Sequence, residues 1–150
     1  MNQDNVELMR RHFSYEERGD SDAVLAEMTD SPEYYIPARG DEVVRTKAGI
    51  RAIHQSLSDA FPDLTIEVKS LFATDTHGCA EVILSGTHAR EFVGIPATGK
   101  RISYVVASVF TFRDGKIASE SVYYDRRVIL RQLGIQEELV FESATVSRSA

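Results

Sequence analysis

Hydrophobic residues follow a helical spacing in the first half of this chain and a strand spacing in the second half. Spacings of three and four residues predict helices over residues 4–18 and 47–61, with a shorter helix after Gly19. A short strand is expected at residues 34–36, where Pro37 would stop it. The first half of the chain is therefore expected to be mainly helical.

From residue 64 onward, hydrophobic and polar residues alternate, as they do in half-buried strands. Four strands are expected: a first one that begins near residue 64, and three more over residues 79–93, 101–113 and 116–125. A short helix over 126–133 follows them. Asp114 and Gly115 match a two-residue type I′ hairpin turn. Helices followed by a meander of antiparallel strands predict an α+β fold, in which the sheet buries one face against the helices.

The Asp114–Gly115 turn pairs Arg113 with Lys116 and so predicts which side chains share a face of the sheet. One face would carry Tyr104, Val106, Ser108, Phe110, Ser119, Ser121, Tyr123 and Asp125. Aromatic, hydroxyl and acidic side chains together indicate the wall of a ligand pocket, because unpartnered polar groups would destabilise a core. The opposite face is also apolar, which predicts that a second subunit covers it in a homodimer. Its members are Val105, Ala107, Val109 and Val122.

Composition sets the broad class of the protein. At 150 residues and 43% hydrophobic content, the chain is large enough for one domain with its own core. We expect this domain over residues 1–135 and a partly disordered, Ser-rich extension over 136–150. The net charge of −6, the scattered cations and the short apolar runs argue against nucleic-acid and membrane partners. The single cysteine, Cys79, and the lack of a signal-like N-terminus predict a cytoplasmic protein.

Asp125 is the strongest candidate for a catalytic residue, because it follows the last strand at the open end of the expected sheet. In an apolar pocket, burial would raise its pKa and make it a general base for a C–H next to a carbonyl. The alternative role is a helix N-cap, since Asp125 directly precedes the helix over 126–133. The two roles are compatible, although capping hydrogen bonds would lower the pKa.

The four histidines divide into two groups. We expect His88 either to polarise a substrate carbonyl, to hold Asp125, or to be an ordinary hydrogen-bonded strand residue. His54, on the apolar stripe of the third helix, either lines the pocket or is a satisfied core residue. His12 and His77 are expected at the surface. No two histidines have metal-ligand spacing on one element, so no metal is expected.

Other side chains complete the expected substrate-binding set. Tyr15, Tyr35, Tyr104 and Tyr123 either donate hydrogen bonds to a developing enolate or simply pack in the core. Phe92, Ser108, Ser121 and His54 are the remaining expected contacts. Arg90 is expected either as a lid over the pocket mouth or as a solvated loop residue.

Three segments are similar to one known family. They are GTHAREFVGIPATGKRIS (86–103), VFTFRDGKI (109–117) and YYDRRVILRQLG (123–134), and the run AFPDL (60–64) accompanies them. Together they resemble the SnoaL-like polyketide cyclases, which belong to the nuclear transport factor 2-like, or ketosteroid-isomerase-like, superfamily. The resemblance covers about residues 4–135. It implies a curved antiparallel sheet wrapped around helices into a cone with a deep pocket, commonly in a dimer.

The resemblance also implies a chemistry without a cofactor. In the family's cyclases an acid at the end of the last strand serves as general acid and base in an intramolecular aldol condensation, and Asp125 matches it by position. His88 matches the histidine of the family's GTH motif. The chain departs from the family pattern at Arg90, where glycine is frequent, and near Ser121, where tryptophan is common.

Three functions are therefore open at this stage. The first is a cyclase or isomerase, of the lyase or isomerase class, in which Asp125 removes a proton from a small hydrophobic carbonyl compound. His88 and a tyrosine would stabilise the enolate. The second is a hydrolase of the epoxide-hydrolase type, in which Asp125 activates water. The third is a non-catalytic module that binds a small molecule, because the superfamily contains such domains as well.

Overall fold

The structure is a computed structural model that describes residues 1–136, so the predicted extension falls almost wholly outside the described residues. The elements are α1 (Gln3–Glu17), α2 (Ser21–Ala26), β1 (Met28–Tyr35), η1 (Pro37–Arg39), β2 (Val43–Val44), α3 (Lys47–Ala60), β3 (Thr65–Ala73), β4 (His77–Thr87), β5 (Arg101–Arg113), β6 (Lys116–Tyr123) and α4 (Arg126–Gln132). Among these residues, no helix is long and apolar enough to cross a membrane.

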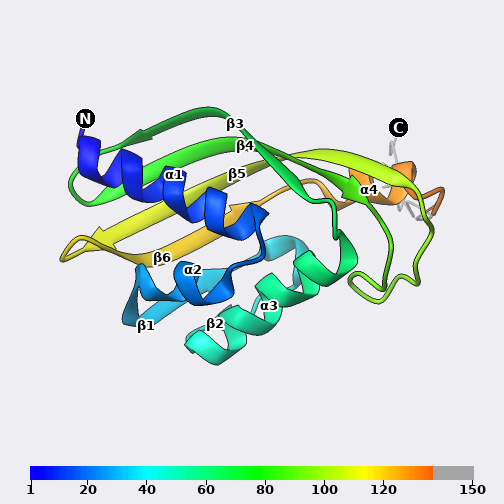
Figure 1. Cartoon of the computed structure of the whole chain (residues 1–150), viewed down its shortest axis with the longest axis horizontal. Helices are drawn as coiled ribbons and strands as arrows, with labels where there is room; N and C mark the ends of the chain where they lie inside the picture. Colours follow the sequence, from blue (N-terminus) through cyan, green and yellow to red (C-terminus); the bar gives the residue numbers. More distant parts are fainter. Residues whose placement is uncertain (137–150) are drawn as a thin grey trace, which may run out of the picture.

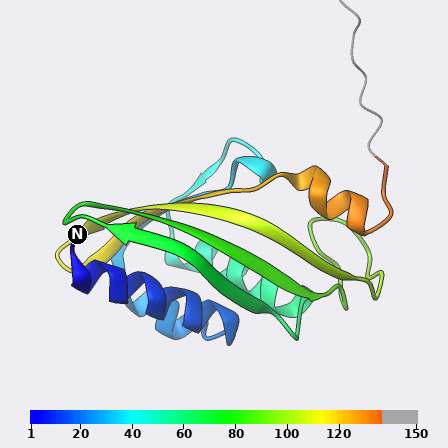
Figure 2. The ribbon, with the colours of Figure 1, turned by 90° about the horizontal axis from the view of Figure 1, so that it is seen from above.

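The six strands form one curved, open sheet in the order β2-β1-β6-β5-β4-β3. Neighbouring strands are antiparallel except for β1 and β6, which run parallel. The helices α1, α2 and α3 lie on one side of this sheet, and α4 lies beyond the end of β6 (Figures 1 and 2). The predicted α+β fold is confirmed.

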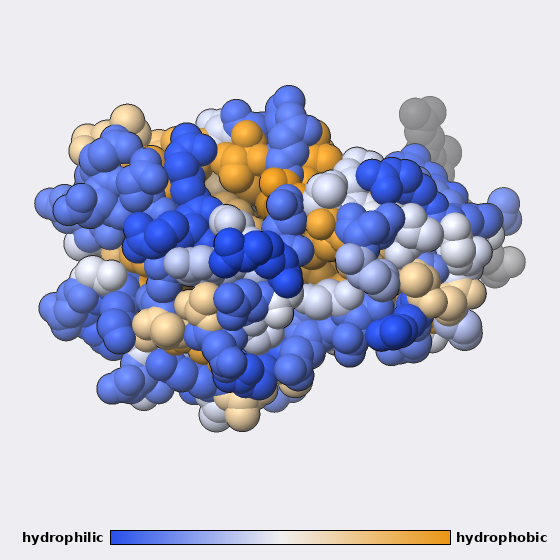
Figure 3. All heavy atoms as spheres, in the orientation of Figure 1, coloured by the Kyte–Doolittle hydropathy of each residue, from blue (hydrophilic) through white to orange (hydrophobic). Residues whose placement is uncertain are grey.

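The core lies between α1, α3 and the concave face of the sheet. Every second residue of β5 from Ile102 to Phe112 is buried there, as the alternation predicts. Gly78 of β4 allows α1 to approach closely, since a Cβ at this position would lie 2.7 Å from the Met9 sulfur. In Figure 3 this side of the molecule is mainly hydrophilic, and hydrophobic side chains are visible near its centre, over the strands beside the C-terminal half of α1.

Two strand predictions differ from the structure in their bounds. β1 begins at Met28 and not at residue 34, and the structure adds a short strand, β2, before α3. The strand predicted over 79–93 ends at Thr87, because the chain then turns into a loop. The His88 N–H still donates to the Lys100 carbonyl opposite it, but further along Val93 adopts a φ of 46° that no strand allows.

The predicted hairpin turn is confirmed, but the expected register beyond it is wrong. Arg113 lies opposite Lys116, yet the next pairs are Phe112 with Ile117 and Thr111 with Ser119. Ala118 is thus an extra residue, a β-bulge that shifts the remaining part of β6 by one position.

The bulge reverses the two faces of β6. Glu120 and Val122 face the helices and are 2% and 9% exposed. Ser121 and Tyr123 face outward, and Tyr123 is 45% exposed. The predictions that Ser121 and Tyr123 line the pocket face, and that Val122 lies on the outer face, are therefore wrong.

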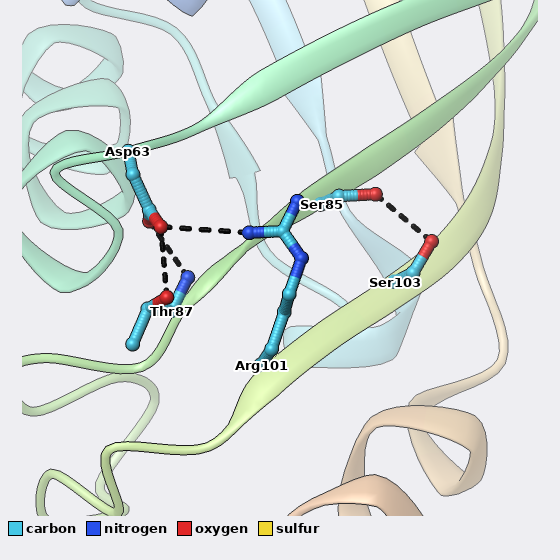
Figure 4. A network of polar contacts seen from close by, with 5 residues as sticks. All are labelled: Asp63, Ser85, Thr87, Arg101 and Ser103. Atoms are coloured by element: carbon cyan, nitrogen blue, oxygen red, sulfur yellow. Dashed lines mark hydrogen bonds and ion pairs between the residues drawn. The ribbon is translucent and has the colours of Figure 1, made fainter.

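Asp63, in the AFPDL run, connects the segment after α3 to β4 of the sheet through hydrogen bonds (Figure 4). Its Oδ1 accepts the Thr87 N–H at 2.7 Å, and its Oδ2 accepts the Thr87 hydroxyl at 2.7 Å. The Arg101 guanidinium lies 3.5 Å from Oδ2, and the hydroxyls of Ser85 and Ser103 bond across the strands at 2.9 Å. The two hydrogen bonds from Thr87 lower the pKa of Asp63. The network fixes the base of the loop over residues 88–100.

Candidate active site

A small cavity of about 40 Å³ lies inside the cone. Its apolar walls are Phe13, Ile36, Ile53, Leu57, Val82, Leu84, Val106 and Val122. Its polar lining consists of Glu16, Tyr34, Arg39, His54, Tyr104, Ser108, Glu120 and Tyr124. This volume holds roughly three water molecules. We call it the inner cavity.

A buried ion pair lies beside the inner cavity. His12 of α1 places its Nε2 atom 3.1 Å from Glu120 Oε2 and 3.8 Å from Glu16 Oε2. The His12 side chain is fully buried and that of Glu120 is 2% exposed. The ring N–H is not aligned for a hydrogen bond, so the contact is mainly electrostatic. The prediction that His12 lies at the surface is wrong, whereas His77 is exposed as expected.

The electrostatics of this pair favour charge on both partners. Burial opposes a charged imidazole, but the carboxylate of Glu120, aided by Glu16 and Glu27, raises the pKa of His12 to about 9. Burial also opposes a charged carboxylate, but His12 and a hydrogen bond from Ser108 lower the pKa of Glu120. Near neutral pH the cavity therefore holds a charged Glu120.

The other titratable groups of the inner cavity are neutral or only partly ionised near pH 7. Burial and the charge of Glu120 raise the pKa of Glu16 to about 7, although His12 opposes this. Burial and the positive charge of His12 lower the pKa of His54 to about 4, so its imidazole is neutral. Burial raises the pKa of Tyr34 and of Tyr104 well above their usual value, so both phenols keep their protons. Near neutral pH the inner cavity thus combines the carboxylate of Glu120 and a partly ionised Glu16 with several neutral hydrogen-bond donors.

His54 is notable among these donors because neither of its ring nitrogens has a hydrogen-bond partner. Its ring packs edge-on against Tyr34 at 5.5 Å and against His12 at 6.0 Å, and the residue is only 3% exposed. A buried polar group without a partner costs about 1–3 kcal/mol. A bound molecule could supply the missing partner.

A larger chamber of about 570 Å³ lies at the open end of the cone. It is lined by Ala38, Arg39, Gly40, Phe92, Val93, Ile95, Tyr124, Arg126, Ile129 and Leu130. Arg39 and Tyr124 also line the inner cavity, so these two side chains mark the boundary between the two spaces. We call this space the outer chamber. Its size suits a small organic molecule, which the inner cavity alone would not hold.

The structure places Asp125 outside both cavities. Its side chain is 55% exposed, its Oδ1 accepts the Arg127 N–H at 2.9 Å, and the Arg127 guanidinium lies 3.6 Å away. These are the contacts of the N-cap of α4. The expected location of Asp125 on the pocket face is wrong, because the bulge turns Tyr124 inward and the strand ends before Asp125.

His88 is fully buried, but it lies beneath the loop that follows β4 and lines neither cavity. Its Nδ1 contacts the Thr98 hydroxyl at 3.0 Å, and its ring packs at 5.8 Å from that of Phe61. The structure therefore does not bring His88 together with Asp125.

The other expected contacts divide in the same way. His54, Tyr104 and Ser108 line the inner cavity, and Phe92 lines the outer chamber. Tyr15 lines neither, since it packs at the edge of the core beneath Arg18, and Tyr35 pairs with the outward-facing Ser121. Arg90 is exposed and lies 4.0 Å from Asp59. Among residues 1–136, no group of three or more acidic, histidine or cysteine side chains is arranged to hold a metal ion.

The sequence interpretation missed His12, Glu16, Glu120 and Arg39. A signal for two of them was present. His12 and Glu16 stand four residues apart and share the buried side of α1 with Met9 and Phe13, so two titratable residues interrupt an apolar stripe. No comparable signal marks Glu120, because its orientation depends on the bulge.

The curved six-stranded sheet with three helices on one side defines a class, the α+β proteins with a ketosteroid-isomerase-like, or nuclear transport factor 2-like, fold. A family model for the SnoaL-like polyketide cyclases matches residues 6–133, and the chain belongs to this family. The resemblance inferred from the sequence is thereby confirmed. Among curated proteins, no sequence matches the chain.

Solved structures agree with this assignment. AclR of Streptomyces galilaeus, described as a candidate hydroxylase, is 26% identical, with a TM-score of 0.75 over 85% of this chain and 93% of AclR. IdmH of Streptomyces antibioticus, described as a candidate polyketide cyclase, is 23% identical, with a TM-score of 0.75 over 89% of this chain and 100% of IdmH. A Catenulispora acidiphila protein with a ketosteroid isomerase-like fold, in complex with trimethylamine, is 15% identical, with a TM-score of 0.74 over 87% and 94% of the two chains. The last two similarities concern the fold alone.

Proposed function

We propose that this protein is a cofactor-free acid–base enzyme that cyclises or isomerises a carbonyl compound, with Glu120 as the general base. The observation that carries the proposal is a buried, charged carboxylate on the wall of an otherwise largely apolar cavity. The family resemblance assigns this role to an acid at the end of the last strand, which is Asp125 by position, whereas Glu120 lies within that strand. In this chain Glu120 reaches the inner cavity and Asp125 does not.

The reaction would begin at a C–H bond next to a carbonyl group. Glu120 takes the proton, and the carbonyl oxygen gains the negative charge of an enolate. Tyr34, Tyr104 and neutral His54 are donors on the same cavity wall, and hydrogen bonds to that oxygen would stabilise the charge. In a cyclisation, the enolate carbon attacks a second carbonyl of the same molecule. The new alkoxide then recovers the proton from the Glu120 carboxylic acid.

The pKa of Glu120 restricts the substrate. His12 lowers this pKa, so Glu120 is a weak base. A weak base removes only a relatively acidic C–H proton efficiently, such as one between two carbonyl groups. Chains with carbonyl groups on alternate carbons carry such protons, and this agrees with a polyketide-like substrate.

A matched pair of variants tests the assignment. We expect Glu120→Gln to slow deuterium exchange at C1 of 2-tetralone, an apolar ketone with an acidic C–H, at least 100-fold in NMR assays. Asp125→Asn should change the rate less than threefold, because that side chain lies in solvent. Glu120→Asp keeps the charge and controls for loss of folding. The opposite ranking of Glu120→Gln and Asp125→Asn would restore Asp125 as the base.

The small volume of the inner cavity favours one alternative, in which Glu120 activates water for hydrolysis of an epoxide or a similar group. The cavity holds a few water molecules beside the carboxylate. Turnover in ¹⁸O-labelled water would place the label in the product of a hydrolysis but not in the ring formed by an aldol reaction. A non-catalytic binding module would instead bind ligand equally well with Glu120→Gln and show no exchange activity.

For the assembly, we propose a homodimer formed through the outer face of the sheet. Phe72, Val105, Val109 and Tyr123 of three strands are each at least 40% exposed on the side away from the helices. Large apolar side chains gathered in this way are costly in water. Val105→Glu should convert a dimer to a monomer in sedimentation velocity experiments, and a monomeric native chain would contradict the proposal.

A further inference from the structure

Arg39 occupies the point where the cavities of this protein meet. It is the last residue of η1 and lines the inner cavity, the outer chamber and a side cavity of about 130 Å³. Its guanidinium carbon lies 5.3 Å from the centre of the Phe92 ring, a cation–π contact on the outer-chamber wall. This stacking holds the cation at the boundary without satisfying its N–H donors.

Arg39 also differs from the arginines around it. Within the described part of the chain, no carboxylate lies within ion-pair distance of its guanidinium. By contrast, Arg90, in the loop that carries Phe92, lies 4.0 Å from Asp59, and Arg101 at the base of this loop lies 3.5 Å from Asp63. The guanidinium at the cavity boundary is therefore free to bind an external anion.

Acidic side chains line only one of the two spaces that meet at Arg39. The outer chamber is lined by Arg39 and, among the described residues, by no acid, in a chain whose net charge is −6. The acids Glu16 and Glu120 line the inner cavity instead. A molecule with an anionic end would be attracted at the boundary and repelled from the inner cavity. Its uncharged end would then be the one that enters.

We propose that the outer chamber binds an apolar molecule with a single anionic group, a carboxylate or an acidic enol, which Arg39 holds at the boundary. Apolar contacts to Phe92, Ile129 and Leu130 would cover the body of the molecule. Arg39 thereby selects anionic over neutral substrates and orients the carbonyl end toward Glu120. The orienting role rests on the function proposed above, whereas the binding of the anion does not require it.

A pair of probes with the same ring system separates charge from shape. We would titrate the protein with 8-anilinonaphthalene-1-sulfonate, which is anionic, and with N-phenyl-1-naphthylamine, which lacks the sulfonate, and follow fluorescence. Arg39→Gln should weaken binding of the anionic probe about 10- to 100-fold, the usual effect of a lost charge-assisted hydrogen bond. Binding of the neutral probe should change less than twofold. Arg39→Lys should retain more anionic-probe affinity than Arg39→Gln.

Arg90→Gln is the matched control, because it removes an arginine from the neighbouring loop that lines none of the three cavities. It should leave both affinities unchanged. Raised salt should weaken the binding of the anionic probe but not that of the neutral probe, since Arg39 is exposed and its charge is screened by salt. Equal losses for both probes in Arg39→Gln, unchanged affinity for the anionic probe, or no binding of it to the native protein would each overturn the proposal. Glu120→Gln should bind the anionic probe at least as tightly as the native protein, because the variant keeps Arg39 and loses a negative charge, so failure of the catalytic proposal would be seen separately.

Discussion

Raising the pH should remove a measurable part of the stability of this protein, because His12 would lose its proton while buried beside Glu120. The pKa of His12 in the folded protein is about 9, against an ordinary value of 6.5. A group whose pKa is raised by folding stabilises the protein fully below its ordinary pKa. That stabilisation is lost as the pH rises through the folded value. Each pKa unit corresponds to roughly 1.4 kcal/mol, so the complete loss is about 3 kcal/mol.

The window of about pH 7 to 9.5 isolates this effect from the other buried groups. His54 is already neutral there, since its pKa is about 4. Glu16 contributes mainly below the window, because its raised pKa of about 7 lowers stability as the pH rises from 4.5 to 7. Urea denaturation at fixed pH would measure the change. The free energy of unfolding typically falls by about 2 kcal/mol per molar urea, so the complete loss should lower the urea midpoint of unfolding by roughly 1.5 M.

Glu120→Gln supplies the comparison. The largest interaction that raises the pKa of His12 comes from Glu120, so the variant should lose at least half of the alkaline slope. Every other titratable group is the same in both proteins, so the difference between their slopes isolates the contact between His12 and Glu120. A native protein of constant stability between about pH 7 and 9.5 would refute the reasoning, as would an unchanged slope in Glu120→Gln.

Three further substitutions probe separate features. Asp125→Ala should lower the free energy of unfolding by about 0.5–2 kcal/mol in urea denaturation, because α4 loses its N-cap, and a loss of ketone exchange activity would contradict this purely structural role. Gly78→Ala should lower the free energy of unfolding by about 1–3 kcal/mol, since the new Cβ would lie 2.7 Å from the Met9 sulfur. An unchanged stability in thermal denaturation would argue against that close approach. His54→Leu should raise stability by about 1–2 kcal/mol while slowing exchange, because two unpartnered ring nitrogens leave the core, and lower stability would show that they are satisfied in the protein.

The architecture could be predicted from the sequence because it depends on signals that extend over many residues. The change of hydrophobic period located the helices and the sheet. The Asp114–Gly115 turn positioned β5 against β6 at Arg113 and Lys116, because both turn residues adopt the positive φ that the pair favours. The alternation along β5 correctly placed Tyr104 and Ser108 on the inner face.

The site could be predicted only in part, because it depends on single residues. One extra residue, Ala118, exchanges the faces of β6, and nothing in the alternation marks it. The sequence predicts a surface position for His12, because the partner that makes its burial tolerable, Glu120, is more than one hundred positions away. Arg39 acquires its position from a short turn whose conformation no spacing rule supplies.

The bulge at Ala118 gives the chain an unusual sensitivity to length. Deleting that one residue would restore a continuous ladder and exchange the faces of everything beyond it in β6. Glu120 and Val122 would turn toward solvent or toward a neighbouring molecule, and Ser121 and Tyr123 would turn inward. A relative that lacks the extra residue would thus present a different side chain at the same point on the concave face of the sheet, without any substitution. Insertions and deletions of single residues in this strand are therefore a route by which one scaffold acquires new reactions.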